Sequence, residues 1–167
     1  YNKLFENWLL TSIILILFMV IVGGLTRITD SGLSITNWEL FKGILPPSSQ
    51  SEWNEYFALY KLIPQYKLIN SSITLNEFKF IFYWEYYHRL LGRFIGLFYL
   101  LPLLYFTFKN VIKTNYIKNF YLIFGIICFQ GFIGWYMVES GLTNLVSVSH
   151  YRLALHLVVA FLIISMI

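Results

Sequence analysis

The sequence predicts an all-α integral membrane protein, a four-helix bundle that spans the bilayer. Of its 167 residues, 58% are hydrophobic and only 12% are charged, whereas a soluble domain carries about a quarter charged residues. Apolar runs of about 20 residues, the length that crosses the hydrocarbon core, recur along the chain. The twelve Lys and Arg residues are scattered, which argues against a nucleic-acid-binding protein and fits the charge bias of membrane proteins.

Four apolar runs are expected to form the transmembrane helices of one domain: residues 8–29, 80–108, 116–138 and 150–167. The chain begins with Tyr1 and ends inside the fourth run, so we expect it to be the first half of a longer protein, truncated at the C-terminus. Residues 109–118 contain three lysines and no acid. The positive-inside rule therefore places this loop and the N-terminus on the cytoplasmic or matrix side, and the second and fourth spans run inward from the outer side.

Residues 30–79 connect the first two spans, and their mixed charges place them outside. Two prolines, Pro46 and Pro47, interrupt this outer loop. Beyond them, aromatic side chains recur at the i, i+3, i+4, i+7 spacing of one helix face: Trp53, Tyr56, Phe57 and Tyr60. The stripe predicts a short helix on the outer surface. Such a helix either contributes to a site or serves only as a packing lid.

A short motif occurs twice, which indicates an internal repeat. Residues 30–34 read DSGLS and residues 139–143 read ESGLT. Each copy follows an outgoing span and precedes, after an outer loop, an incoming span with a histidine near its start. The pattern predicts a duplicated helical hairpin, and membrane proteins built from repeats often place their site at the repeat interface.

Two histidines lie at matched depth within the second and fourth spans. His88 lies about eight residues, or about 12 Å, into its span, and His156 lies at a similar depth in a span of the same direction. Ionisable groups inside spans usually serve a site. Two imidazoles so placed are suited to hold a haem between two helices through both axial positions of its iron. His150 falls about 240° from His156 around the helix and is expected at the surface.

Small and acidic neighbours share the face of His88. Gly92 and Gly96 follow at i+4 and i+8, and their missing side chains either leave room for a flat ligand or form a helix-packing motif. Glu85 precedes His88 by one turn and lies on the same face. Its carboxylate is a candidate to orient the imidazole, take a proton or face the edge of the ligand. The alternative is an interfacial acid in contact with an arginine.

Arginines in the outer parts of the spans are candidates to bind the carboxylates of a haem: Arg27, Arg89, Arg93 and Arg152. Arg152 lies one turn before His156, so its guanidinium is placed to pair with a propionate in a fork geometry. For Arg27, Arg89 and Arg152 the alternative is snorkelling to lipid head groups. Arg93 is deeper in its span, where that alternative is harder to apply.

Three stretches of the chain resemble the haem A synthase family: residues 23–47 (GGLTRITDSGLSITNWELFKGILPP), 77–93 (EFKFIFYWEYYHRLLGR) and 131–157 (GFIGWYMVESGLTNLVSVSHYRLALHL). The resemblance covers all four spans and much of the outer loop. It implies an eight-helix protein of two pseudosymmetric halves, each with a histidine pair, in which this chain is the first half. Many bacterial members carry a cysteine pair in an outer loop. That pair is missing here, so the chain resembles the cysteine-free branch of alphaproteobacteria and mitochondria, expected in the bacterial or mitochondrial inner membrane.

The resemblance also implies an activity, the oxidation of the C8 methyl group of haem O to the formyl group of haem A, the prosthetic group of cytochrome c oxidase. This half would bind the substrate haem O, and the second half a haem b cofactor. His88 and His156 match the family's paired histidines. Glu85 matches the acid of its E-x-x-H motif, which makes Glu85 the candidate catalytic residue. Implied partners are haem O synthase, an electron donor, membrane lipids and a second copy in a homo-oligomer.

Two other classes of function are compatible with the residues alone. A non-enzymatic b-type cytochrome, carrying electrons through two axial histidines, explains the pair equally well but does not require Glu85 beside His88. A transporter with an intramembrane polar site fits the repeat but explains the paired histidines poorly. Turnover of the substrate separates the enzyme from the cytochrome, and a tightly bound haem separates both from the transporter.

Overall fold

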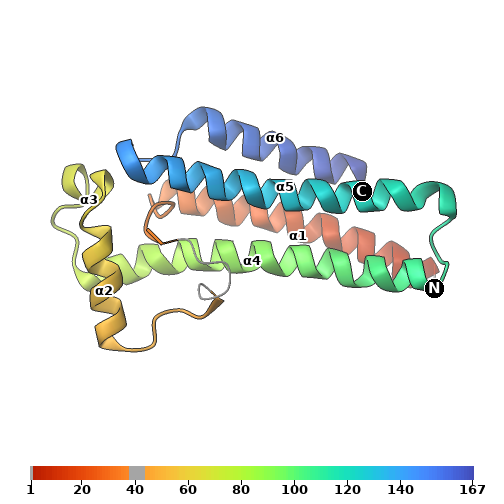
Figure 1. Cartoon of the computed structure of the whole chain (residues 1–167), viewed down its shortest axis with the longest axis horizontal. Helices are drawn as coiled ribbons and strands as arrows, with labels where there is room; N and C mark the ends of the chain where they lie inside the picture. Colours follow the sequence, from red (N-terminus) through yellow and green to blue (C-terminus); the bar gives the residue numbers. More distant parts are fainter. Residues whose placement is uncertain (1, 38–43) are drawn as a thin grey trace.

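The computed structural model describes residues 2–37 and 44–167, and this part of the chain folds into six α-helices without a strand. Two short helices, α2 Gln50–Tyr60 and α3 Pro64–Leu68, lie at one end of the molecule. Four long helices lie side by side along its length (Figure 1): α1 Asn2–Ile28, α4 Leu75–Phe108, α5 Thr114–Asn144 and α6 His150–Met166. The predicted all-α fold class is confirmed.

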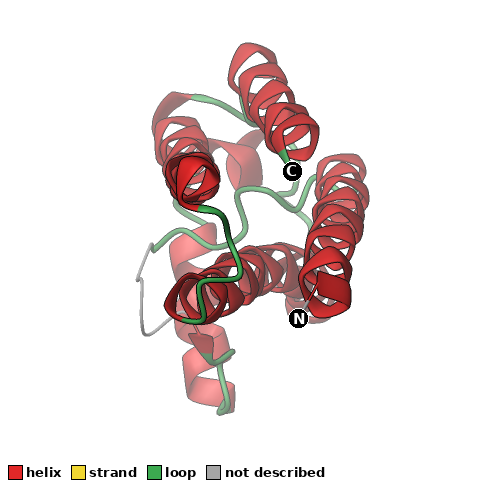
Figure 2. Ribbon diagram, turned by 90° about the vertical axis from the view of Figure 1, so that its right-hand side faces the viewer, coloured by secondary structure: helices red, strands yellow, loops and turns green. Residues whose placement is uncertain are grey.

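The four long helices pack around a common interior. The neighbouring pairs are α1 with α4, α4 with α5, α5 with α6, and α6 with α1. Helices α4 and α6 therefore stand at opposite corners of the bundle, as the end-on view shows (Figure 2). The two hairpins expected from the repeat, α1 with α4 and α5 with α6, each form one of these pairs. The two histidines of the expected site thus come from helices that face each other diagonally.

The hydrophobic core divides into two clusters along the bundle axis. On α4, Tyr86 belongs to the outer cluster, beneath α2, and Ile95 to the inner cluster. On α6, Leu153 packs against the outer cluster and Val159 belongs to the inner one. The two histidines of the expected site fall between these positions, so they lie at the level where the apolar core changes from one cluster to the other.

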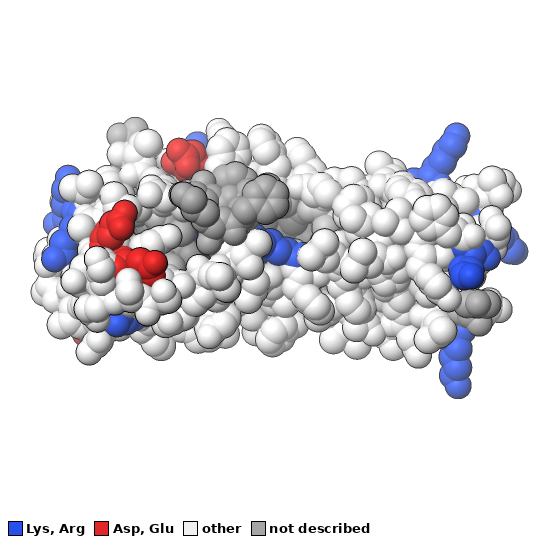
Figure 3. All heavy atoms as spheres, turned by 60° about the horizontal axis from the view of Figure 1, so that its bottom comes forward, with Lys and Arg blue, Asp and Glu red and all other residues white. Residues whose placement is uncertain are grey.

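Three of the four predicted spans are confirmed as helices long and apolar enough to cross a membrane, namely α1, α4 and α5. Helix α6 has 17 residues, which is about 25 Å of helix against a hydrocarbon core of about 30 Å, so the fourth span stays a prediction. The charged side chains seen in Figure 3 differ between the two ends of the molecule, and which end is the outer one stays a prediction. In this view acids and bases mix at the end that carries α2, and only basic side chains are seen at the other end.

Three helices extend well beyond their predicted spans, and the first is α1, which begins at Asn2 rather than at residue 8. Helix α4 begins at Leu75, five positions before the apolar run, because Thr74 and Glu77 form a capping box at its N-terminus. Helix α5 continues to Asn144 rather than ending at Val138, since the second motif copy stays helical. The apolar run ends there, but the helical hydrogen bonds continue, and the Ser140 hydroxyl bonds the Tyr136 carbonyl one turn back (2.6 Å), which a helix tolerates.

Helix α2 confirms the short helix predicted in the outer loop, and it crosses the end of the bundle (Figure 1). Trp53 and Tyr60 of the aromatic stripe are buried against α4. Ring centroids lie 5.0 Å apart for Trp53 and Phe82, and 5.1 Å apart for Tyr60 and Phe78. Each such pair contributes about 0.5–1.5 kcal/mol beyond its buried area. The part of the outer loop that forms α2 is therefore a packed cover on the bundle.

A chain of hydrogen bonds ties this cover to the end of α1. Asn70 donates to the Tyr60 hydroxyl (2.8 Å), Tyr60 donates to Gln65 Oε1 (3.1 Å), and Gln65 Nε2 donates to the Asp30 carbonyl (3.0 Å). Burial raises the pKa of the Tyr60 phenol, which keeps it protonated as a donor. Asp30 itself has a φ of 50°, in the left-handed region that aspartate tolerates. This turn directs the chain back across the end of the bundle.

The N-terminus of α2 is closed by a second capping box. Ser49 Oγ accepts the N–H of Glu52 (3.2 Å), and the Glu52 carboxylate accepts the N–H groups of Ser48 (2.6 Å) and Ser49 (3.1 Å). These bonds, that of Ser48 first, hold the pKa of Glu52 below its usual value.

We expect the first turn of α2 to loosen in acid. Because the pKa of Glu52 is lower in the folded chain, its stabilisation is fully present above the unfolded value, about 4.3. It is lost as the pH falls through the lower folded value. Amide hydrogen exchange of α2 in the solubilised full-length protein, corrected for intrinsic rates, should show this loss, and Glu52→Gln should remove its pH dependence. Equal protection of the wild-type turn on both sides of the transition would contradict it.

Candidate functional site

His88 of α4 packs against a glycine of the neighbouring helix. A Cβ atom added to Gly23 of α1 would lie 3.2 Å from His88 Nε2 and 3.7 Å from Cδ2. This is tighter than nine in ten real Cβ contacts, so a side chain at position 23 would require the imidazole to shift by a few tenths of an ångström. The next residue, Gly24, has nothing within 4 Å. The close approach of the two helices at the histidine therefore depends on Gly23.

His156 of α6 has the same relation to α5. A Cβ atom on Gly134 would lie 3.3 Å from His156 Cε1 and 3.9 Å from Nε2. Each hairpin thus places a glycine of its first helix opposite the histidine of its second helix. The sequence prediction missed both glycines and selected Gly92 and Gly96 of α4. Both glycines are visible in the sequence, Gly23 in GGLTR and Gly134 in GFIGW. The spacing of residues within one helix does not show which residue of a neighbouring helix lies opposite a histidine.

The role of the two histidines as axial ligands of a haem stays a prediction. His156 Nδ1 is buried and has no hydrogen-bond partner within residues 2–37 and 44–167. The glycines beside the two rings let each imidazole approach the neighbouring helix closely. No cluster of three or more His, Cys, Asp and Glu side chains able to hold a metal ion was found among the described residues, so the two histidines stand as a pair on opposite helices.

Gly92 lies on the face of His88, as predicted, but it is not open space. A Cβ atom there would lie 3.3 Å from the terminal methyl group of Met19 on α1. A methionine end is flexible and moves at small cost. Gly96 has nothing within 4 Å. The role of Gly92 in giving room to a ligand stays a prediction.

Glu85 is 3% exposed, and its carboxylate is held by the start of the outer loop. Oε2 accepts the Ser34 hydroxyl (2.7 Å) and the Ile35 N–H (2.9 Å), and Oε1 accepts Arg89 Nη2 (2.5 Å). Arg89 also donates to the Ile35 carbonyl (3.3 Å). Glu85 is therefore in contact with an arginine, Arg89, as the alternative interpretation of the sequence expected. We call the group formed by Ser34, Ile35, Glu85 and Arg89 the loop latch.

The loop latch lies where the two copies of the repeated motif meet. Leu33 of the first copy is 1% exposed, and a Cβ atom on Gly141 of the second copy would lie 3.0 Å from Leu33 Cδ2. The Ser34 hydroxyl also bonds the Ile81 carbonyl of α4 (3.3 Å). The loop is thus fixed between α4 and α5 on the outer side of the two histidines.

The four candidate arginines do not gather at one place. Arg27 lies at the outer end of α1 with Nη2 3.4 Å from Nδ1 of His150, which is exposed, as expected. Arg152 donates to the Ser140 hydroxyl and lies 4.9 Å over the ring of Tyr136. Arg89 belongs to the loop latch, and with Arg93 it lines a hollow under the outer loop. Arg27 and Arg152 thus make their contacts among α1, α5 and α6, whereas Arg89 and Arg93 belong to α4.

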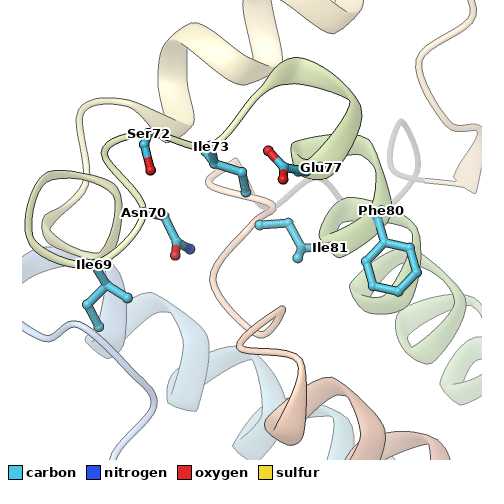
Figure 4. Close-up of a pocket in the computed structure, with 7 residues that line it drawn as sticks. All are labelled: Ile69, Asn70, Ser72, Ile73, Glu77, Phe80 and Ile81. Carbon is cyan, nitrogen blue, oxygen red and sulfur yellow. The ribbon is translucent and has the colours of Figure 1, made fainter.

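Another hollow lies between the α3–α4 connection and the start of α4 (Figure 4). Of the seven side chains drawn there, Glu77 is the only charged one. Its carboxylate already accepts the Thr74 N–H (2.8 Å) and hydroxyl (2.7 Å). Since this hollow contains neither histidine, it is not the site formed by His88 and His156.

Known proteins resemble the chain along its whole length. A family model described as cytochrome oxidase assembly protein (COX15-CtaA) matches residues 6–167. The heme A synthase of Pelagibacter ubique is 58% identical over 167 residues, which are 100% of this chain and 50% of the relative. The heme A synthase of Rickettsia bellii is 53% identical over 97% of this chain and 48% of the relative. That of Flavobacterium psychrophilum is 45% identical over 96% of this chain and 48% of the relative. The chain spans about half the length of these curated relatives. No solved structure matches it.

Proposed function

We propose that this chain, which belongs to the COX15-CtaA family of cytochrome oxidase assembly proteins, forms the substrate-binding half of an enzyme that makes haem A. The reaction would be the oxidation of the C8 methyl group of haem O to a formyl group. The name heme A synthase of the relatives supports this proposal. The observation that carries it is the pair of histidines on diagonal helices, each packed against a glycine of its hairpin partner.

In this proposal His88 and His156 hold the iron of haem O, the group that supplies the carbon to be oxidised. Gly23 and Gly134 let the two imidazoles themselves pack closely against α1 and α5. Gly92 would give room to the ligand once the flexible end of Met19 moves aside. Charged groups at the outer end would bind the propionates. The four arginines named above are the candidates, and Arg27 and Arg152 lie nearest the outer end of α6.

Glu85 is proposed as the residue that controls the outer side of this site and handles protons there. Its Oε2 accepts a hydrogen bond from the Ser34 hydroxyl. These two oxygens are therefore suited to share a proton between the outer loop and α4. The loop latch would also exclude water from the histidine level, because it fixes Leu33 into the gap beside Gly141.

Other parts of the proposal concern the whole protein. A haem b would be bound by the part of the relatives that this chain does not match. An electron donor would supply reducing equivalents, and haem O synthase would supply the substrate. The location would be the inner membrane of a bacterium or a mitochondrion, with the N-terminus of α1 on the cytoplasmic or matrix side. A homo-oligomer is a further expectation.

The test is haem analysis of the full-length protein in a host that makes haem O but no haem A. We expect extracted haem A with the wild type and none with His88→Ala, because one axial ligand is lost. An exposed-site control, Cys128→Ala, should make haem A at the wild-type level. Bound haem b without any oxidised product, at good expression and with haem O available, would contradict the enzyme and favour a two-histidine cytochrome that carries electrons.

A further inference from the structure

Arg27 and His150 join the two hairpins at the end of the bundle that carries α2. Arg27 is in the last turn of α1, and His150 is the first residue of α6. The two side chains meet although 123 positions separate them in the sequence, with Arg27 Nη2 3.4 Å from His150 Nδ1. The contact therefore connects the ends of two helices that also pack side by side.

This contact presents hydrogen-bond donors and a positive charge. A guanidinium can only donate, so His150 Nδ1 is the acceptor and the ring carries its proton on Nε2. The Nε2–H of His150 and the remaining N–H groups of Arg27 are therefore donors at one place. Asp30 follows Arg27 by three positions, but the ion pair found in the described part of the chain is that of Arg89 with Glu85. A carboxylate for Arg27 must then come from a bound molecule.

The pair lies between the two histidines of the proposed site and the α2 end of the bundle. Arg27 is one helical turn, about 6 Å, beyond Gly23, the glycine that contacts His88. His150 precedes His156 by six positions of α6, or about 9 Å. A haem carries its two propionates on one edge of the ring, each at the end of a two-carbon chain. With the iron at the level of the histidines and this edge toward α2, the carboxylates approach the level of the pair.

The other three arginines are less suited to the same carboxylate. Arg89 already donates to a carboxylate and a carbonyl of the loop latch. Arg93 follows His88 by five positions, which places it about 140° away around α4. Arg152 is turned toward α5, where it donates to the Ser140 hydroxyl. The guanidinium at the end of α1 has an imidazole as its partner, and a carboxylate binds a guanidinium more strongly.

We propose that Arg27 and His150 bind a propionate of haem O, to which Arg27 supplies the positive charge and His150 the Nε2–H donor. The inference rests on the proposed function, since it takes His88 and His156 as ligands of the substrate's iron. The C8 methyl group is attached to the same pyrrole ring as one of the propionates. Holding the propionate edge at the α2 end therefore directs the reacting methyl group to that end as well, where Glu85 lies.

The experiment compares haem O with its dipropionate dimethyl ester, which has the same ring and iron but no carboxylate. Each is titrated into the full-length protein purified from a host without haem O, and binding is followed by the visible-absorption component that His156→Ala removes. We expect the wild type to bind the acid more tightly than the ester. Arg27→Gln and His150→Leu should each weaken binding of the acid roughly tenfold, the effect of losing one hydrogen bond to a charged group, and leave the ester unchanged.

Two control variants test whether the effect is specific. His150→Gln keeps an N–H donor near the position of the imidazole Nε2, so it should retain most of the wild-type affinity for the acid. Lys118→Gln also removes a positive charge, but from an exposed side chain of α5 at the end of the bundle opposite α2 (Figure 1). It should match the wild type with both haems.

Three results would contradict the propionate site. Equal weakening of acid and ester in Arg27→Gln would mean that Arg27 only supports the fold. Equal affinity of the wild type for the two haems, or no change in either with Arg27→Gln, is the result expected of an arginine that snorkels to lipid head groups. A wild type without a component that depends on His156 would overturn the ligand role as well. Binding that prefers the acid, without any formation of haem A, would leave the propionate site intact and contradict only the proposed enzyme.

Discussion

Glu85→Ala is expected to open the loop latch and to stop the formation of haem A by the full-length protein. The substitution leaves the Arg89 guanidinium, the Ser34 hydroxyl and the Ile35 N–H without their shared acceptor. Breaking a buried ion pair by removing one partner costs about 3–5 kcal/mol, and both side chains are shielded here, with 4% of Glu85 and 16% of Arg89 exposed. Residues 31–35 should then lose protection in hydrogen exchange.

Companion variants show whether Glu85 acts through the loop or through a proton. Ser34→Ala removes one hydrogen bond to the Glu85 carboxylate, about 1.5–3 kcal/mol for a bond to a charged group, and should lower haem A formation only in part. Glu85→Gln keeps an acceptor for the Ile35 N–H. Loss of haem A in Glu85→Gln with wild-type protection of residues 31–35 would assign Glu85 a proton-transfer role. Wild-type protection of this loop in Glu85→Ala would show that the latch does not hold it.

The sequence was sufficient to predict those features that depend on one helix at a time. Apolar runs identify α1, α4 and α5 because a bilayer core needs a fixed length of apolar helix, and the stripe that contains Trp53 identifies α2 because one face of it is buried. The contact of Glu85 with Arg89 follows in the same way from their spacing of four residues. Each of these predictions uses a spacing that is set by the α-helix itself.

Contacts between segments that are distant in the sequence could not be predicted from helical spacing. Ser34 precedes Glu85 by 51 positions, and nothing in helical periodicity shows that a loop will reach the carboxylate. The same limit explains the choice of Gly92, which shares the His88 face, in place of Gly23, which lies opposite it on α1. Only the packing of α1 on α4 fixes that register. The extension of α5 was missed because hydropathy falls at Glu139 while the helix continues.

Gly134→Val and Gly23→Val are expected to remove the haem bound through the two histidines. At both positions a Cβ atom alone would lie 3.2–3.3 Å from an imidazole atom, and valine adds two methyl groups to it. Overpacking of this kind costs about 1–3 kcal/mol and displaces the ring, because the imidazole atoms are the nearest neighbours of the added group. A displacement of the imidazole is enough to lose an axial ligand.

The chain provides a matched control for each of these variants. Gly24 is adjacent to Gly23 on α1, Gly131 is one turn from Gly134 on α5, and neither has an atom within 4 Å of its added Cβ. Gly24→Val and Gly131→Val therefore carry the same change in helix propensity without the contact. We expect the site's haem, followed by its visible absorption, to bind roughly 5–150-fold more weakly in Gly23→Val and Gly134→Val, the change that corresponds to 1–3 kcal/mol. It should persist in the two controls. Equal loss in all four variants would mean that valine disturbs the helices in general, and the glycines would then have no specific relation to His88 and His156.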